Sequence, residues 1–327
     1  MEIGKVSESI LKRAVFKQIG QRRDEVLVRP GVGEDCSVIE LADDEVVVFS
    51  TDPITGTTKN MGTLAVHVTA NDIATSGAEL IGILLTILLP SNTYESELAR
   101  LMEEIETTSI ELGIEVLGGH TEVTDVINQP LISITGVGKI KKHKMVKTAG
   151  IKPNQEIVMT KWAGLEGTSI IANEREKELL GRFTKDFVER AKDLISNISI
   201  IKEAKIATEM GGVSSMHDIT EGGVYGALWE MGEASSVGLE VDISKIPIKQ
   251  ETIEICEFYN LNPYKLISSG SMLIASDRGN ALVAKLKENG INAVVIGSAT
   301  TGNDKIAING EYKSFLSPPK SDELYKL

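Results

Sequence analysis

Residues 45–57 read EVVVFSTDPITGT, and this stretch indicates how the first half of the chain folds. A run of valines that ends in a phenylalanine is rich in β-branched and aromatic residues, so it predicts a buried strand at 45–50. Asp52 follows almost directly, and Pro53 and Gly56 are typical of a chain that turns after a strand. The stretch therefore places a carboxylate where a buried strand meets a turn.

The segments around this stretch alternate between helix and strand. Helices are predicted at 7–19, 62–76 and 94–112, where apolar residues recur at helical spacing and Gly20, Gly77 and Gly113 follow as stop signals. Strands are predicted at 80–89, 115–117 and 131–140, with a loop after residue 117. The first half is therefore expected to be an α/β domain.

The second half also mixes the two element types. Strands are predicted at 156–161, 271–276 and 291–297, a helix at 280–289, and a turn at Asn309-Gly310. A basic stretch at 139–144 reads as a solvated connector, so two domains are expected, 1–150 and 151–327. No fixed repeat is visible, which excludes a solenoid.

Composition narrows the class of protein. The chain has 327 residues, 42% hydrophobic and 25% charged, as expected for globular domains. A formal net charge of -13 repels a phosphate backbone and argues against nucleic acid as a partner. Cys36 and Cys256 are too few for a disulfide framework or a Cys-rich zinc site. The longest apolar run, 80–89, is about half of a membrane span, and residues 1–5 do not resemble a secretory signal, so a cytoplasmic protein is expected.

Acidic residues recur beside apolar strands and glycine turns. They lie in five segments, 31–39, 45–57, 70–77, 117–122 and 216–223. Burying a lone carboxylate costs several kcal/mol, so such acids need cations or hydrogen-bond donors. Mg²⁺ prefers oxygen ligands and bridges carboxylates to polyphosphates, and glycine-rich turns offer N–H groups to phosphates. The pattern predicts a metal–nucleotide site.

Each acid also has a purely structural interpretation. Asp35 could end a turn, Asp52 could cap the segment after its strand, and Asp72 could be a satisfied carboxylate inside a helix. The functional interpretation is favoured because the alternative must explain all the segments independently. The chain contains no dinucleotide fingerprint, phosphate loop or nucleophile elbow, and its histidines lack a metal-binding spacing. Cys36, followed by Val38 and Ile39, is expected to be a buried thiol without reactivity.

Six stretches carry a resemblance to a known family. They are GVGEDCSVI at 31–39, FSTDPITGTTKN at 49–60, HVTANDIATSGAE at 67–79, GGHTEV at 118–123, MHDITEGGVYGALWEM at 216–231 and SSGSMLIAS at 268–276. In this order they resemble the family of aminoimidazole ribonucleotide (AIR) synthase, the hydrogenase-maturation protein HypE, thiamine-monophosphate kinase and selenophosphate synthetase. The resemblance covers nearly the whole chain and is nearest to HypE.

The resemblance implies a fold and a site. An N-terminal α/β domain would pair across a homodimer into a β-barrel, with a C-terminal α+β domain packed on it, and the protein would bind ATP with Mg²⁺. The matching positions imply a metal and phosphate shell of Asp35, Asp52, Asp72, Glu122 and Asp218. They also imply that Thr51, Lys59, Asn71, Gly118 and Gly119 line the nucleotide phosphates, and His120 is the candidate catalytic proton shuttle.

The resemblance also implies an activity. A member of this family would use ATP to phosphorylate an oxygen of a small-molecule substrate, such as an amide, carbamoyl, carboxylate or phosphate group, and a HypE-like member would work with a maturation partner protein. HypE proteins carry a cysteine in a C-terminal tail, whereas residues 317–327, SPPKSDELYKL, contain none. The alternatives are therefore a divergent AIR synthase, a thiamine-phosphate kinase, or a non-catalytic nucleotide-binding scaffold.

Overall fold

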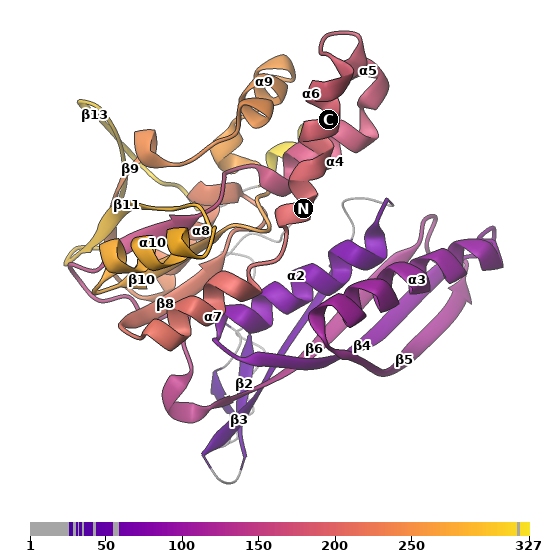
Figure 1. Cartoon of the computed structure of the whole chain (residues 1–327), viewed down its shortest axis with the longest axis horizontal. Coiled ribbons are helices and arrows are strands. Elements are labelled where there is room, and N and C mark those ends of the chain that lie inside the picture. Colours follow the sequence, from indigo (N-terminus) through magenta and orange to yellow (C-terminus); the bar gives the residue numbers. More distant parts are fainter. Residues whose placement is uncertain are drawn as a thin grey trace. The chain divides into compact units, whose positions relative to one another are not determined.

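The computed structural model describes residues 26–28, 31, 33–34, 36–41, 44–54, 59–318 and 321–327. The helix predicted at 7–19 and the candidate ligand Asp35 lie outside these residues. The chain divides into two compact units. We call 26–28 with 36–145 the N-terminal domain, and 31, 33–34 and 146–327 the C-terminal domain; they run from indigo to magenta and from magenta to yellow in Figure 1.

The N-terminal domain is built on one sheet with two helices. In the described residues the strand order is β1-β2-β3-β6-β4-β5, and every pair is antiparallel except β4 with β5. The strands are β1 Val26–Val28, β2 Ser37–Glu40, β3 Glu45–Ile54, β4 Glu79–Pro90, β5 Glu115–Thr124 and β6 Leu131–Lys141. The helices are α2 Met61–Thr75 and α3 Glu95–Leu112, and α3 forms the crossover between the parallel strands.

Helix α2 lies close to the middle of this sheet because two glycines of β6 leave room for it. A Cβ atom added to Gly136 would come within 2.6 Å of Thr69 Cγ2, and one added to Gly138 within 2.5 Å of Ile73 Cγ2. Along β6, buried residues alternate with half-buried ones, as expected for a sheet covered on one face. On the other face Leu84 of β4 is 41% exposed, so the domain leaves an apolar sheet surface open.

The C-terminal domain is a second α/β unit. In the described residues its strand order is β13-β12-β9-β11-β7-β10-β8, antiparallel except for β12 with β9. The strands are β7 Glu156–Thr160, β8 Val213–Asp218, β9 Gly238–Asp242, β10 Met272–Ser276, β11 Ala293–Thr300, β12 Lys305–Asn309 and β13 Tyr312–Phe315. The α-helices are α4 Leu165–Glu174, α5 Glu176–Leu180, α6 Lys185–Asp193, α7 Ile201–Met210, α8 Gly223–Ala234, α9 Gln250–Phe258 and α10 Gly279–Glu288. Its short 3₁₀ turns are η4 Leu194–Asn197, η5 Ile243–Lys245, η6 Pro263–Lys265 and η7 Glu323–Lys326, whereas η3 Lys142–Lys144 belongs to the N-terminal domain.

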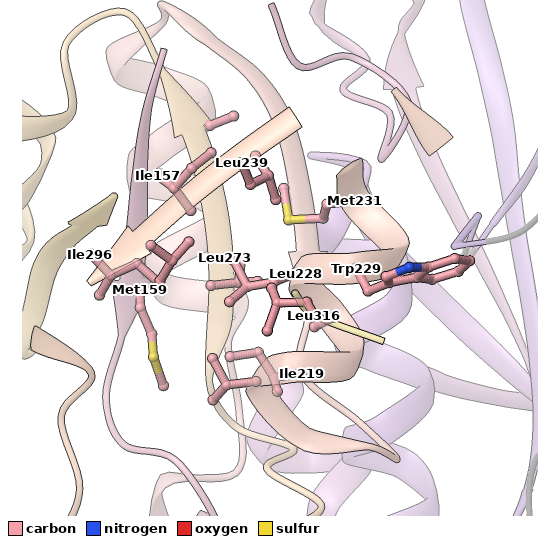
Figure 2. Packing of buried hydrophobic residues seen from close by; sticks show 14 of the residues in the cluster. Ile157, Met159, Ile219, Leu228, Trp229, Met231, Leu239, Leu273, Ile296 and Leu316 are labelled. Atoms are coloured by element: carbon pink, nitrogen blue, oxygen red, sulfur yellow. The ribbon is translucent and has the colours of Figure 1, made fainter. Parts of the chain in front are cut away.

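Two kinds of contact hold this domain together. Figure 2 shows the apolar core, where Leu228 of α8 packs with Leu273 of β10 and Leu239 of β9. An ion pair is also buried: Lys161 Nζ lies 2.7 Å from Glu203 Oε1 of α7, and both side chains are almost fully enclosed. Burial lowers the pKa of Lys161, although the nearby Glu203 charge opposes this.

Most predicted elements are confirmed, and two predictions are wrong. The turn expected after the strand at 45–50 is absent at Asp52, because β3 continues through Asp52 to Ile54 in register with β6. The strands and helices expected at 45–50, 62–76, 80–89, 94–112 and 280–289 are present, and Gly113 ends α3 in the left-handed region. The loop predicted after residue 117 is instead part of strand β5, which continues to Thr124. Gly118 and Gly119 lie within β5 with φ angles of 147° and 153°, so this glycine pair forms part of an extended edge strand and not a turn. No helix in the described part of the chain combines the length and apolar content that crossing a membrane requires.

Candidate functional site

Asp72 is fixed between helix α2 and strand β3. Its side chain is buried, and Ser50 Oγ donates a hydrogen bond of 2.5 Å to Asp72 Oδ2. The Asp72 main-chain oxygen accepts a 2.6 Å bond from Thr75 Oγ1 and a 3.0 Å contact from Cys36 Sγ. The Ser50 bond orients the carboxylate, and the other two bonds fix the main chain that carries it, as a metal ligand requires.

Asp52 lies on the same side of the sheet as Asp72. Side chains two residues apart on a strand share a face, so Asp52 projects toward the helix-covered side, as Ser50 does, about 7 Å further along β3. Asn71, next to Asp72 on α2, is fully buried. The structure therefore brings two of the predicted metal ligands to one side of β3, and their carboxylate oxygens are the donors that Mg²⁺ prefers.

Three other candidates face the opposite side of the sheet. Thr51 is exposed there and accepts a 2.9 Å bond from Thr135 Oγ1. On edge strand β5, His120 Nε2 lies 3.2 Å from Glu122 Oε2, with both side chains more than half exposed. Registers run from β3 through β6 and β4 to β5, so three strand spacings, about 14 Å, separate this pair from β3. Within one copy of the domain, His120 and Glu122 thus form a group apart from Asp52 and Asp72.

The glycine pair of β5 marks a close approach of backbone to backbone. A Cβ atom on Gly119 would lie 2.1 Å from Leu85 O of β4, whereas one on Gly118 would meet only Leu84 Cδ2 at 3.9 Å. Lys59, an exposed residue, comes two residues before α2 begins at Met61. Glycine N–H groups and a lysine ammonium are the kinds of group that bind phosphate oxygens.

Asp218 belongs to the C-terminal domain. It ends β8, is 1% exposed, and is followed by the turn that begins α8, where Gly222 has φ 83°. Its neighbour His217 contacts Glu230 of α8 through Nε2 at 3.2 Å, with both side chains buried. The five predicted metal ligands are thus divided between two domains and a residue outside the described ranges. Among the described residues, no group of three His, Cys, Asp or Glu side chains is arranged to hold a metal ion.

Sequence reasoning missed Ser50. The signal was present, because Ser50 stands two residues before Asp52 on the same strand, but its hydroxyl reaches Asp72 only through the packing of α2 on β3. Both cysteines are buried, as predicted for Cys36, and burial raises the pKa of the Cys256 thiol to about 12. Neither thiol is therefore suited to act as a nucleophile.

The two sheets with their helices define a two-domain α/β protein. Residues 33–140 match the family model for the N-terminal domain of AIR synthase related protein, and residues 152–309 match the model for its C-terminal domain. The chain belongs to the AIR synthase related protein family.

The relatives and solved structures that resemble this chain include hydrogenase-maturation proteins. A putative hydrogenase expression/formation protein of Methanocaldococcus jannaschii is 28% identical over 318 residues, covering 93% of this chain and 91% of the relative. Among solved structures, HypE in its complex with HypF superposes with a TM-score of 0.76 at 19% identity, covering 88% of this chain and 94% of that one. HypE in complex with ATP gives a TM-score of 0.74 at 21% identity, covering 90% and 92%. These structures share the two-domain fold of this protein.

Proposed function

We propose that the protein is an ATP- and Mg²⁺-dependent enzyme that phosphorylates an oxygen of a small-molecule substrate, with a carbamoyl or amide group as the first candidate. The observation that carries this proposal is the orientation of two carboxylates, Asp52 and Asp72, toward one side of β3, with Ser50 holding Asp72. The HypE structure with ATP supports the nucleotide, and the hydrogenase expression/formation relative supports the HypE-like role.

The residues have separate tasks in this proposal. Asp35, Asp52, Asp72, Glu122 and Asp218 are assigned to the metal and phosphate shell, while Thr51, Lys59, Asn71, Gly118 and Gly119 line the phosphates. Bound Mg²⁺ would neutralise charge on the polyphosphate, which is the main requirement of phosphoryl transfer besides positioning. His120 is assigned to hold the proton of the acceptor oxygen, and its 3.2 Å contact with Glu122 orients the ring.

A homodimer is part of the proposal. The open face of the N-terminal sheet carries Thr51, Leu84 and His120, and apolar side chains there remain exposed in a single copy. A second copy that covers this face would bury Leu84 and bring His120 against the neighbouring subunit. The HypE–HypF complex suggests that a protein partner also binds, as expected for a maturation enzyme.

The test is calorimetric titration of the protein with ATP, with and without Mg²⁺, alongside an assay of ADP release. Asp72→Asn keeps the shape of the side chain and an oxygen that can accept from Ser50, so the fold should persist. We expect it to weaken Mg²⁺-dependent ATP binding by about tenfold or more. The matched control is Asp125→Asn, an exposed acid between β5 and β6, which should bind as wild type.

The outcomes separate the alternatives. Wild-type affinity in Asp72→Asn would remove Asp72 from the metal shell. Mg²⁺-dependent binding without ADP release on any of the carbamoyl, amide, carboxylate or phosphate acceptors would favour the non-catalytic scaffold. Turnover with the substrate of AIR synthase or of thiamine-monophosphate kinase would assign the chain to that activity.

A further inference from the structure

A short segment, residues 321–327, docks on the C-terminal domain through a buried acid. Asp322 is 2% exposed, and its Oδ2 accepts a 2.8 Å bond from the N–H of Gly222. Its Oδ1 accepts a 2.9 Å bond from the N–H of Leu324, and the N–H of Ile267 also donates to this carboxyl. Gly222 is the N-cap of α8 and has no side chain to accept from its own helix, so Asp322 acts as an acceptor at this helix end.

A second buried acid lies near this contact. Glu166, in the first turn of α4, is 3% exposed and accepts hydrogen bonds from Ser269. No donor within the described ranges reaches its Oε2 atom. Asp322 lies against the same segment as Glu166, because their donors Ile267 and Ser269 are two residues apart in the chain. The charges of Asp322 and of the half-buried Glu221 act on Glu166 as well. A buried carboxyl oxygen that lacks a donor is a natural place for a proton.

The chemistry of the two acids supports that assignment. Burial, assisted by the charges of Glu221 and Asp322, raises the pKa of Glu166 to about 7, although Ser269 opposes the shift. Burial likewise raises the pKa of Asp322 to about 6, in spite of its backbone N–H donors. Near neutral pH, both groups therefore change protonation in the folded protein.

We propose that Glu166 and Asp322 form a proton-linked latch: docking of the 321–327 segment takes up a proton at this pair, and a rise in pH releases the segment. When both acids are charged, two carboxylates repel each other in the interior. When the segment leaves, both reach water, and each returns to its ordinary acidity. The docked state therefore binds protons more tightly than the released state, and linkage weakens docking as pH rises.

Other contacts also hold the segment to the C-terminal domain. Glu323 Oε2 accepts a 3.0 Å bond from the N–H of Asn262, and Arg175 donates to the main-chain oxygen of Leu327. Leu324 packs against the apolar cluster formed by α4, α6 and α9. Other titratable or charged groups near the pair and on the docked segment include Glu221, Cys256, Glu323, Tyr325, Lys326 and Arg175. The Lys326 ammonium is bound to Glu323, and Cys256 stays neutral in this pH range.

The direction of the pH effect follows from the two pKa values. Docking is at full strength below the ordinary values of 3.8 for Asp322 and 4.5 for Glu166. It weakens as pH rises through about 6 for Asp322 and about 7 for Glu166. Linkage to a single proton allows a change in the docking equilibrium of at most about tenfold per pH unit.

Hydrogen exchange of the full chain between pH 5 and pH 8 tests the latch. At each pH, the exchange rates of the amides of residues 321–327 and of Gly222 are divided by the rates of the same amides in the unfolded chain. This ratio removes the intrinsic pH dependence of exchange. In wild type, we expect the corrected exchange to increase with pH. In Glu166→Gln, an uncharged side chain of the same shape, the increase above about pH 6 should be largely lost, and the segment should be better protected at pH 8 than in wild type.

Two further measurements secure the interpretation. Asp322→Ala removes the acceptor and should give fast exchange at every pH, which shows that the signal reports docking. A ¹³C titration of the Glu166 carboxyl in wild type and Asp322→Asn should show a lower pKa in the variant, because a neighbouring charge is gone. Equal pH dependence of exchange in wild type and Glu166→Gln, or an unchanged Glu166 titration, would overturn the proposal.

Discussion

Replacing Gly119 by alanine should separate strands β4 and β5, and replacing Gly118 by alanine should not. Both glycines have a positive φ, so each substitution carries conformational strain of about 1–2 kcal/mol. Only at Gly119 does the added Cβ atom come within 2.1 Å of a main-chain oxygen, Leu85 O, which cannot rotate away. Ordinary C···O contacts are about 3.3 Å or longer, so the strands must move apart by about 1 Å.

The magnitude follows from that displacement. Overpacking a site that cannot relax costs about 1–3 kcal/mol, and N–H···O bonds stretched by about 1 Å are lost. We therefore expect Gly119→Ala to destabilise the N-terminal domain by about 2–5 kcal/mol, about 1–3 kcal/mol more than Gly118→Ala. His120 follows directly on β5, so Mg²⁺–ATP affinity should fall in Gly119→Ala if β5 contributes to the site.

The assay can distinguish the domains because both tryptophans, Trp162 and Trp229, belong to the C-terminal domain. Urea unfolding followed by far-UV circular dichroism should show an earlier transition in Gly119→Ala, while tryptophan fluorescence should keep its wild-type midpoint. Equal stability of the two alanine variants, within about 0.5 kcal/mol, would refute the close approach of β5 to Leu85 O.

Three further predictions concern stability. Glu203→Ala should destabilise the C-terminal domain by about 3–5 kcal/mol because it leaves the buried Lys161 unpaired. Glu209 is in an exposed ion pair on the same helix, so Glu209→Ala should destabilise the domain by about 0.5 kcal/mol or less. Urea unfolding followed by tryptophan fluorescence measures both. Ile105→Ala should destabilise the N-terminal domain by about 2–5 kcal/mol because Ile105 is fully buried on α3. Ile110, on the same helix, is 68% exposed, so Ile110→Ala is the control. Unfolding followed by circular dichroism measures both, and equal losses of stability would contradict the packing of Ile105. Because burial raises the pKa of Glu166, its contribution to stability is present below pH 4.5 and is lost as pH rises through about 7. Glu166→Gln should therefore match wild type at pH 4 and exceed it at pH 8 by at most about 3 kcal/mol, the limit while the 321–327 segment stays docked, as urea unfolding followed by tryptophan fluorescence would show.

The sequence predicted those parts of the fold that depend on one residue and its chain neighbours, such as the ends of helices. Gly77 and Gly113 end their helices as expected, because a left-handed residue at a helix end is a property of the glycine itself. The loop predicted at Gly118-Gly119 was wrong because the conformation of these glycines depends on pairing with a distant strand. Glycine allows a turn and an extended mirror-image conformation equally well, and only pairing with β4 selects the strand.

The site was predictable as a list of residues but not as an arrangement. Alternation along β3 places Ser50 and Asp52 on one face and Thr51 on the other, which the sequence alone implies once a strand is assumed. Which face α2 covers depends on the packing of the sheet, so the grouping of Asp72 with Asp52 required the structure. The separate His120 group depends on the strand order, which no local pattern carries.

The two glycines of β6 have an evolutionary consequence. The atoms nearest to a Cβ placed on either glycine belong to none of the predicted ligands, yet the space the glycines leave determines how closely α2, and with it Asp72, approaches the sheet. An alanine at position 136 would collide with Thr69 Cγ2, the methyl group that a serine lacks. Positions 69 and 136 should therefore change together among descendants of this chain, with a larger residue on the strand tolerated only beside a smaller one on the helix.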